Sequence, residues 1–558
     1  MNRSFATIFF CVFLFACGES EVDERIQVDT ILHNGKVITI DADLSIVSAV
    51  AINGTDIVAV GGEELLQTHK SSNTVDLDGK VLMPGFVDSH THLRGQPQRY
   101  VDLTKTRSIE ELKVQVSDKV AEIGIGEWIT GYGWSEDVMA ELRRPLRSDL
   151  DDAAPDNPVL LTRAGGHSAV ANSMALRLAE VTTTTPQPES GVIERGEDGE
   201  LNGVIRERQD IVSRLIPEST NEDVRDSLIG ILNEQFSFGI TSFTHATGSI
   251  ESYPEWEYIY GMHRGSLPRA SIQVRWEGPD AMSAFGKKSG DGDEFLRVGP
   301  IKIFVDGGFT GPAAFTKEPY KGETEYRGKL SLTLEELETT IREAHAAGWQ
   351  FGIHAIGDAA IELTVDELAA ALDDMPRDDH RNYLNHFTVM PSAESMDKMA
   401  AYNIAITQQP NFTYTLDGRY SEYLDGDRLK HNNPLRTPMD HGVRVAISSD
   451  ILPIGPMVGI YAAVTRKGMS GTVFGEEESL SVMEALRGYT LYGAWLSFEE
   501  DRKGSIEPGK LADMIVLDQD ILTIDPAHIM DIEVEQTWLG GKMVYLRSEN
   551  ASADAIRR

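Results

Sequence analysis

Cysteine is nearly absent from this chain. Only two of its 558 residues are cysteines, Cys11 and Cys17, and both lie within the first 20 positions. The rest of the chain can therefore form no disulfide and can offer no thiolate to a metal. Any metal must be held by histidines, carboxylates or a modified lysine.

Basic residues are also scarce. The chain has 51 lysines and arginines against 88 aspartates and glutamates, which gives a formal net charge of −37. Nucleic-acid binding needs a basic face that can neutralise phosphates, so this composition argues against it. We expect a small-molecule substrate as the partner and no nucleic acid, and we leave a homo-oligomer open.

Long apolar runs are missing except at the N-terminus. Residues 5–15 form a short apolar run after Arg3, which is typical of a signal peptide. The run ends in Leu14-Phe15-Ala16-Cys17-Gly18, which resembles a bacterial lipobox, although Phe15 is bulkier than the usual residue. We expect lipidation of Cys17 and a periplasmic protein anchored to the outer membrane. An ordinary secretory signal cut nearby is the alternative.

The two ends of the chain have similar patterns. Short apolar strands and Asn-Gly turns occur near the start, and similar strands recur near residues 512–545. This predicts a small β-sandwich assembled from both termini around a long α/β middle. The predicted segments are a signal (1–17), a tether (18–27), the N-terminal portion of the sandwich (28–82), barrel strand 1 (83–94), an insertion (95–239), the rest of the barrel (240–500), the C-terminal portion of the sandwich (501–547) and a tail (548–558).

The middle of the chain alternates apolar strands with helical stretches. Leu334 to Ala347 has a helical apolar face, and Thr333 is its expected cap. Eight strand–helix units predict a (β/α)8 TIM-type barrel, with the insertion as a subdomain over its mouth. The expected strands are 85–90, 240–245, 271–276, 301–305, 351–354, 383–387, 404–408 and 443–448.

Chemically active residues follow these strands. His90 and His92 are two residues apart, so on a strand both imidazoles point to one side. With 14 histidines in the chain, one such pair alone could be chance. Barrel active sites lie at the carboxyl ends of strands, and four further residues stand at such ends or within them. They are Lys302, His354, His386 and Asp450. Burying these groups without partners is costly, so the set indicates a metal site.

This ordered set resembles the amidohydrolase superfamily. The closer resemblance is to amidohydrolase family 3, the group with YtcJ-like proteins and N-substituted formamide deformylases. The quoted segments are 84–92 (Pro-Gly-Phe-Val-Asp-Ser-His-Thr-His), 302–307, 354–358, 449–450, 509–513 and 131–134 (Gly-Tyr-Gly-Trp). The resemblance spans nearly all of the chain after the signal.

The resemblance implies a two-metal site, with zinc as the expected ion. His90, His92 and Asp450 would bind the first metal. His354 and His386 would bind the second, and Lys302 would bridge both as a carbamate. Asp450 would also carry the proton from water to the leaving nitrogen. A mononuclear site with Lys302 paired to a carboxylate is the alternative.

Several positions depart from the family pattern. Gly165 replaces the usual aspartate before Gly166-His167, Asn385 replaces a glutamate, and His245 replaces an aspartate. We assign His167, His245 and Trp134 as candidate substrate-binding residues. The plain alternative for each is ordinary packing or a place on the surface.

These observations predict a metal-dependent hydrolase that cuts a non-peptide carbon–nitrogen bond of the N-acyl or N-formyl type. One alternative on the same fold is a deaminase of cyclic amidines, against which Lys302 argues. Another alternative is a periplasmic binding protein that has lost catalysis, against which the intact ligand set argues.

Overall fold

The computed structural model describes residues 23–547, apart from 105, 137–138, 165, 167, 189–190, 310–311 and 452–453. Its centre is a parallel eight-stranded sheet in which the strands follow one another in sequence order. The strands are β10 (Phe86–Thr91), β17 (Ile240–His245), β18 (Arg269–Arg275), β19 (Leu296–Phe304), β20 (Phe351–Ala355), β21 (Tyr383–His386), β22 (Ala405–Gln408) and β23 (Val445–Ile447). The predicted (β/α)8 barrel is confirmed, and each expected strand is present.

Helices follow the barrel strands. Helix α9 begins after Thr333, whose side chain accepts the amide of Glu336 in a capping box, as the sequence indicates. The helices of this region are α6 (Asn221–Glu234), α7 (Tyr253–Met262), α8 (Pro279–Phe285), α9 (Leu334–Ala346), α10 (Asp358–Asp374), α11 (Ala393–Ala401), α12 (Pro410–Thr415), α13 (Asp417–Tyr423), α14 (Gly426–Lys430), α15 (Arg436–Asp440), α16 (Pro456–Thr465), α17 (Val482–Gly488) and α18 (Leu491–Leu496). Short 3-10 helices are η1 (Gln235–Phe238), η2 (Glu476–Glu478) and η3 (Pro526–Asp531).

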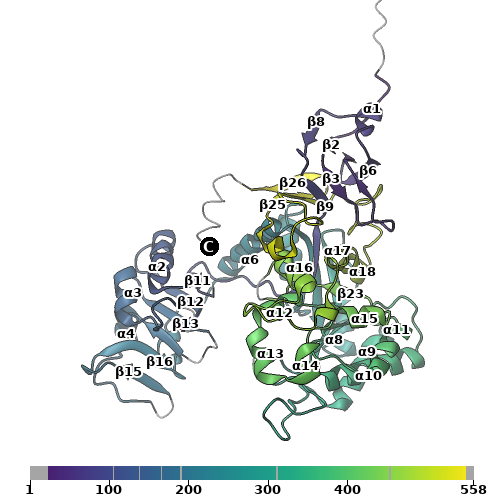
Figure 1. Ribbon diagram of the computed structural model, residues 1–558. Coiled ribbons are helices and arrows are strands. Elements are labelled where there is room, and N and C mark those ends of the chain that lie inside the picture. The colour runs from purple at the N-terminus through teal and green to yellow at the C-terminus, as the bar shows by residue number, and fades with distance from the viewer. Residues whose placement is uncertain are drawn as a thin grey trace, which may run out of the picture.

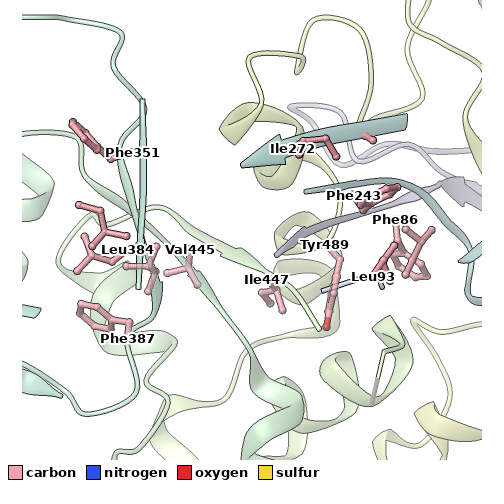
Figure 2. Close-up of a cluster of buried hydrophobic side chains, with 14 of the residues drawn as sticks. Phe86, Leu93, Phe243, Ile272, Phe351, Leu384, Phe387, Val445, Ile447 and Tyr489 are labelled. Atoms are coloured by element: carbon pink, nitrogen blue, oxygen red, sulfur yellow. The ribbon is translucent and has the colours of Figure 1, made fainter. Parts of the chain in front are cut away.

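The barrel core is apolar where the strands face the helices. Figure 2 shows Phe86, Phe243 and Tyr489 close together at the β10–β17 side, with Phe351 and Leu384 on other strands. All five side chains belong to one buried cluster, and each is at most 2% exposed. This core fixes the strands, and with them the positions of the residues at the strand ends.

The first and last barrel strands meet in an irregular seam. Instead of a regular ladder, β10 and β23 are joined by an isolated bridge between Thr91 and Asp450. The amide of Asp450 donates to the carbonyl of His90 at 2.8 Å, and the amide of Ser449 donates to Oδ1 of Asp88 at 3.1 Å. The barrel is therefore nearly closed, and its closure depends partly on side chains.

Two further sheets form a sandwich from both ends of the chain. One sheet has the order β6-β5-β2-β8, and the other has the order β26-β25-β24-β9-β3-β4. Apolar residues from both sheets, including Leu32 and Val516, pack in one core between them. The strands and the small helix are β1 (Ile26–Gln27), β2 (Thr30–His33), β3 (Lys36–Ile38), β4 (Ile46–Val47), β5 (Ala49–Asn53), β6 (Asp56–Gly61), α1 (Leu65–Thr68), β7 (His69–Lys70), β8 (Asn73–Asp76), β9 (Val81–Pro84), β24 (Met514–Leu517), β25 (Val534–Leu539) and β26 (Lys542–Leu546).

The insertion between the first two barrel strands folds around its own sheet. Its strand order is β11-β12-β13-β14-β16-β15, and two separate apolar clusters cover the sheet. Its elements are β11 (Tyr100–Asp102), α2 (Ile109–Ile123), β12 (Ile129–Trp134), α3 (Arg147–Ala153), β13 (Val159–Arg163), β14 (Ser168–Ala171), α4 (Ser173–Leu178), β15 (Val192–Arg195), β16 (Leu201–Arg206) and α5 (Asp210–Ser213). In the view of Figure 1 this unit lies to one side of the barrel, and its expected place over the barrel mouth stays a prediction.

The predicted signal segment, with Cys17, lies outside the described residues. Over the described range of the chain, no helix combines the length and the apolar character that crossing a membrane requires.

Candidate metal centre

Histidines from different strands meet Asp450 at the carboxyl ends of the barrel strands. Donor atoms of His90, His386 and Asp450 all lie within 4.8 Å of one another. Nε2 of His92 lies 3.3 Å from Nε2 of His90 and 3.3 Å from Oδ1 of Asp450. The His-x-His pair therefore faces one point, as the period of a strand predicts.

Neutral partners on other segments orient three of these rings. Nδ1 of His90 lies 2.6 Å from Oδ1 of Asn385, and Nδ1 of His386 lies 2.8 Å from Oε1 of Gln409. An amide oxygen can only accept a hydrogen bond, so Nδ1 of each of these two rings carries the hydrogen and Nε2 keeps a free lone pair. Nδ1 of His92 bonds to Oγ1 of Thr247 at 2.5 Å. Such partners fix ring orientation at metal sites.

Burial keeps the imidazoles neutral. Loss of solvation, reinforced by the nearby Lys302, lowers the pKa of His92 to about 3 and that of His354 to about 3. The same causes bring the pKa of His90 well below its usual value. For His386, burial and the neighbouring His354 have the same effect on the pKa. Neutral imidazole is the form that binds metals.

Lys302 is a buried lysine in the same barrel. Its side chain projects from β19, the residue is 3% exposed, and Nζ has no hydrogen-bond partner among the described residues. Burial lowers its pKa, which makes the neutral amine accessible. Burial likewise raises the pKa of Asp450, although the charge of Lys302 opposes this. These two groups are electrostatically linked across the site.

His354 completes the set from β20. Its ring centre is 4.4 Å from that of His386, and its Nε2 lies 3.6 Å from Oδ1 of Asp306. The carboxylate of Asp306 also accepts hydrogen bonds from the backbone amides of Phe315, Ile356 and Gly357, at 2.9 to 3.0 Å. This carboxylate therefore ties the loops after β19 and β20 together beside His354.

Two cluster residues have unusual backbone angles. His386 has φ of 79° and Asp450 has φ of 57°, although neither is glycine. Left-handed backbone costs free energy at residues other than glycine, so the surrounding structure must hold these two residues in place.

The donor set fits a bound divalent cation. Two imidazole Nε2 atoms lie only 3.3 Å apart, with a carboxylate beside them. Two nitrogen lone pairs this close repel each other unless a proton or a cation lies between them, and burial disfavours the proton here. Lys302 and His354 add buried nitrogens without hydrogen-bond partners among the described residues.

Two other predicted site residues are not part of this donor cluster: His245 lies beside His92, and Trp134 lies in the insertion. His245 is 4% exposed, packs on Trp256 at 5.0 Å between ring centres, and accepts the amide of Leu93. These contacts bury His245 at the end of β17, and its substrate-binding role stays a prediction. Trp134 is fully buried in the insertion core, where its indole donates to the carbonyl of Leu161 at 3.0 Å. Our assignment of Trp134 to the substrate is not supported, because packing within its own sheet buries it. His167 and Gly165 lie outside the described residues.

Sequence reasoning missed four residues beside the cluster. Thr247 and Gln409 orient His92 and His386, and Asp306 and Phe304 border His354. Each stands at or just after the end of a barrel strand, and Phe304 and Asp306 also fall within the family-like segment 302–307. Asp358, which follows His354 closely in sequence, does not support its ring and instead accepts the amide of Lys317.

Comparisons with known proteins agree with this architecture. The sequence profile of the amidohydrolase family matches residues 73–545. The YtcJ protein of Bacillus subtilis is 31% identical over 535 residues, covering 93% of this chain and 99% of that protein. The N-substituted formamide deformylase of Arthrobacter pascens is 27% identical, with the same coverage of both chains. A solved metal-dependent hydrolase of Pyrococcus horikoshii is 25% identical, has a TM-score of 0.68, and matches 89% of this chain and 99% of its own.

Proposed function

Because this chain belongs to the amidohydrolase family and is a hydrolase, we propose that it cuts the carbon–nitrogen bond of a non-peptide amide. The observation that carries this proposal is the convergence of His90, His92, His386 and Asp450 at one end of the barrel. The N-acyl or N-formyl type of substrate is supported by the likeness to a protein named as a formamide deformylase.

We assign the metal-binding roles by position. His90, His92 and Asp450 would hold one divalent ion, His354 and His386 a second, and Lys302 would bridge them as a carbamate. Zinc suits imidazole and carboxylate ligands. When bound, such ions would make water more acidic and polarise the scissile carbonyl.

Asp450 is our candidate for the proton transfer. Its carboxylate lies beside the histidines and is buried, so its raised pKa suits a group that accepts and then gives a proton. It would take one proton from the attacking water and deliver it to the nitrogen as that bond breaks. Water and amide then yield a carboxylic acid and an amine.

Hydrolysis of N-formyl and N-acyl amides by the zinc-loaded protein tests the reaction. We expect release of amine and acid in equal amounts, and a loss of about 10²–10⁴-fold in kcat in Asp450→Asn. Release of ammonia from cyclic amidines without amide hydrolysis would favour the deaminase. No turnover by the zinc-loaded wild type would favour a binding protein.

Metal analysis tests the two-ion arrangement. We expect two zinc ions per chain, and fewer in Lys302→Ala because the bridging group is removed. A full complement of metal and activity in Lys302→Ala would refute the bridge.

We also propose export and lipid anchoring through Cys17. Metabolic labelling with a fatty acid should mark the wild type, and Cys17→Ser should lose the label and leave the membrane fraction. A labelled Cys17→Ser variant would refute this assignment.

A further inference from the structure

Arg275 stands at the carboxyl end of β18 on the inner face of the barrel. Two residues earlier, Gln273 donates to the hydroxyl of Tyr383 at 2.7 Å, and Tyr383 belongs to β21, which is not a neighbour of β18 in the sheet. That contact crosses the interior, so Gln273 points inward. Because side chains on a strand alternate with a period of two, Arg275 faces the same side, one layer nearer the mouth.

The aromatic ring of Phe304 lies beside this arginine. It lies two residues after Lys302 on β19, and its ring centre is 5.3 Å from that of His354 and 4.8 Å from Nζ of Lys302. The guanidinium carbon of Arg275 lies 5.9 Å from the same ring centre. Phe304 therefore connects Arg275 to the metal centre, and its half-buried ring remains partly open to solvent.

The charge of Arg275 is not matched within the described range of the protein. There it has no hydrogen bond or ion pair, and its side chain is exposed. The chain has a net charge of −37, and many of its other arginines are paired with carboxylates. An unmatched arginine at the mouth of the barrel is thus available to an anionic ligand.

We propose that Arg275 and Phe304 form a substrate subsite that selects amides carrying a carboxylate next to an apolar or aromatic group. This inference rests on the proposed amide hydrolysis and names its substrate class. The planar guanidinium can bind a carboxylate through two parallel hydrogen bonds. The ring of Phe304 offers a flat apolar surface between that carboxylate and the metal centre.

A matched pair of ligands separates the charge from the rest of the substrate. N-acetyl-phenylalanine and N-acetylphenethylamine differ only in the carboxylate. Their binding would be measured by calorimetry to the Asp450→Asn protein, in which turnover is slowed about 10²–10⁴-fold, after metal analysis has established its zinc content. We expect the acid to bind about 10-fold more tightly or better, the effect of a charge-assisted hydrogen bond.

Substitution of Arg275 tests the origin of that preference. Arg275→Met in the same background should bring the two ligands to similar affinity, and Arg275→Lys should keep some of the preference. Arg264→Met is the control, because Arg264 also lies over a phenylalanine, Phe295, at 5.3 Å but precedes β18 at its other end and is ion-paired with Asp293. It should leave the preference unchanged.

The outcomes separate this inference from the proposed function. Equal binding of both ligands to the protein with Arg275 intact would overturn the subsite, as would a preference that survives Arg275→Met. If the acid binds through Arg275 but wild-type enzyme hydrolyses no amide, the hydrolytic assignment fails and the subsite stands. If neutral amides are hydrolysed without any preference for the acid, the subsite fails and the hydrolytic assignment stands.

Discussion

Oδ1 of Asn385 lies 2.6 Å from Nδ1 of His90, so the sixth barrel strand orients a ring that belongs to the first. Both side chains are fully buried. A neutral acceptor at position 385 therefore acts directly on a ring of the candidate metal centre.

Replacing Asn385 by leucine should weaken metal binding. The change removes the acceptor and leaves Nδ1 of His90 unpaired in the interior, and the loss of such partners typically costs 10–100-fold in metal affinity. Competition with a coloured chelator measures this affinity. Asn385→Asp keeps an acceptor oxygen and should bind metal at least as well as wild type. Equal affinity in Asn385→Leu would show that the contact does not orient the ring.

Lys302→Met should not destabilise the metal-free protein. Burial lowers the pKa of Lys302, so the folded protein holds its proton less readily than the unfolded chain does, and this lysine costs stability below its unfolded pKa. Methionine has a similar length and no charge that must be desolvated, so the exchange should be neutral or stabilising. Urea unfolding in the presence of a chelator measures the difference. A clear loss of stability would mean that Lys302 has a structural partner.

The metal-free protein should lose stability as the pH falls from 6.5 toward 3. The pKa of His92 and that of His354 are lowered to about 3, so the unfolded chain binds more protons than the folded one across this window. Stability then rises with pH by about 1.4 kcal/mol per pH unit for each ring. His92→Gln should reduce the slope by that amount. An unchanged slope in denaturant titrations at several pH values would contradict the lowered pKa of His92.

Asp513→Ala should destabilise the whole molecule. The carboxylate of Asp513 accepts hydrogen bonds from Nε and Nη2 of Arg269, at 2.7 and 3.1 Å. Both side chains are nearly fully buried. Removing one partner leaves an uncompensated charge, which typically costs about 3–5 kcal/mol. Chemical denaturation measures the loss. Since Arg269 begins β18 and Asp513 precedes β24, retention of wild-type stability would show that barrel and sandwich are joined by other contacts.

The order of the strands and the residues at their ends could be predicted from the sequence. Apolar runs identify each strand, and the barrel geometry then places His90, His354 and Asp450 at one end. The partners of the histidines could not be predicted in this way. Gln409 is 23 residues from His386, and Thr247 is 155 residues from His92, so their contacts depend on the register of different strands.

The insertion shows a second limit of sequence reasoning. Trp134 ends a strand, as many active-site residues do, yet its strand belongs to a separate sheet that buries the indole. A strand end predicts an active-site position only when the sheet to which it belongs is known.

The irregular seam between β10 and β23 links metal binding to the completion of folding. His90 and His92 lie on one side of this seam and Asp450 on the other, about 360 positions apart along the chain. A cation bound by all three residues would connect the two edges of the barrel. Because the two edges must meet before all three residues can bind one cation, we expect metal uptake to accompany the last step of folding rather than to start it.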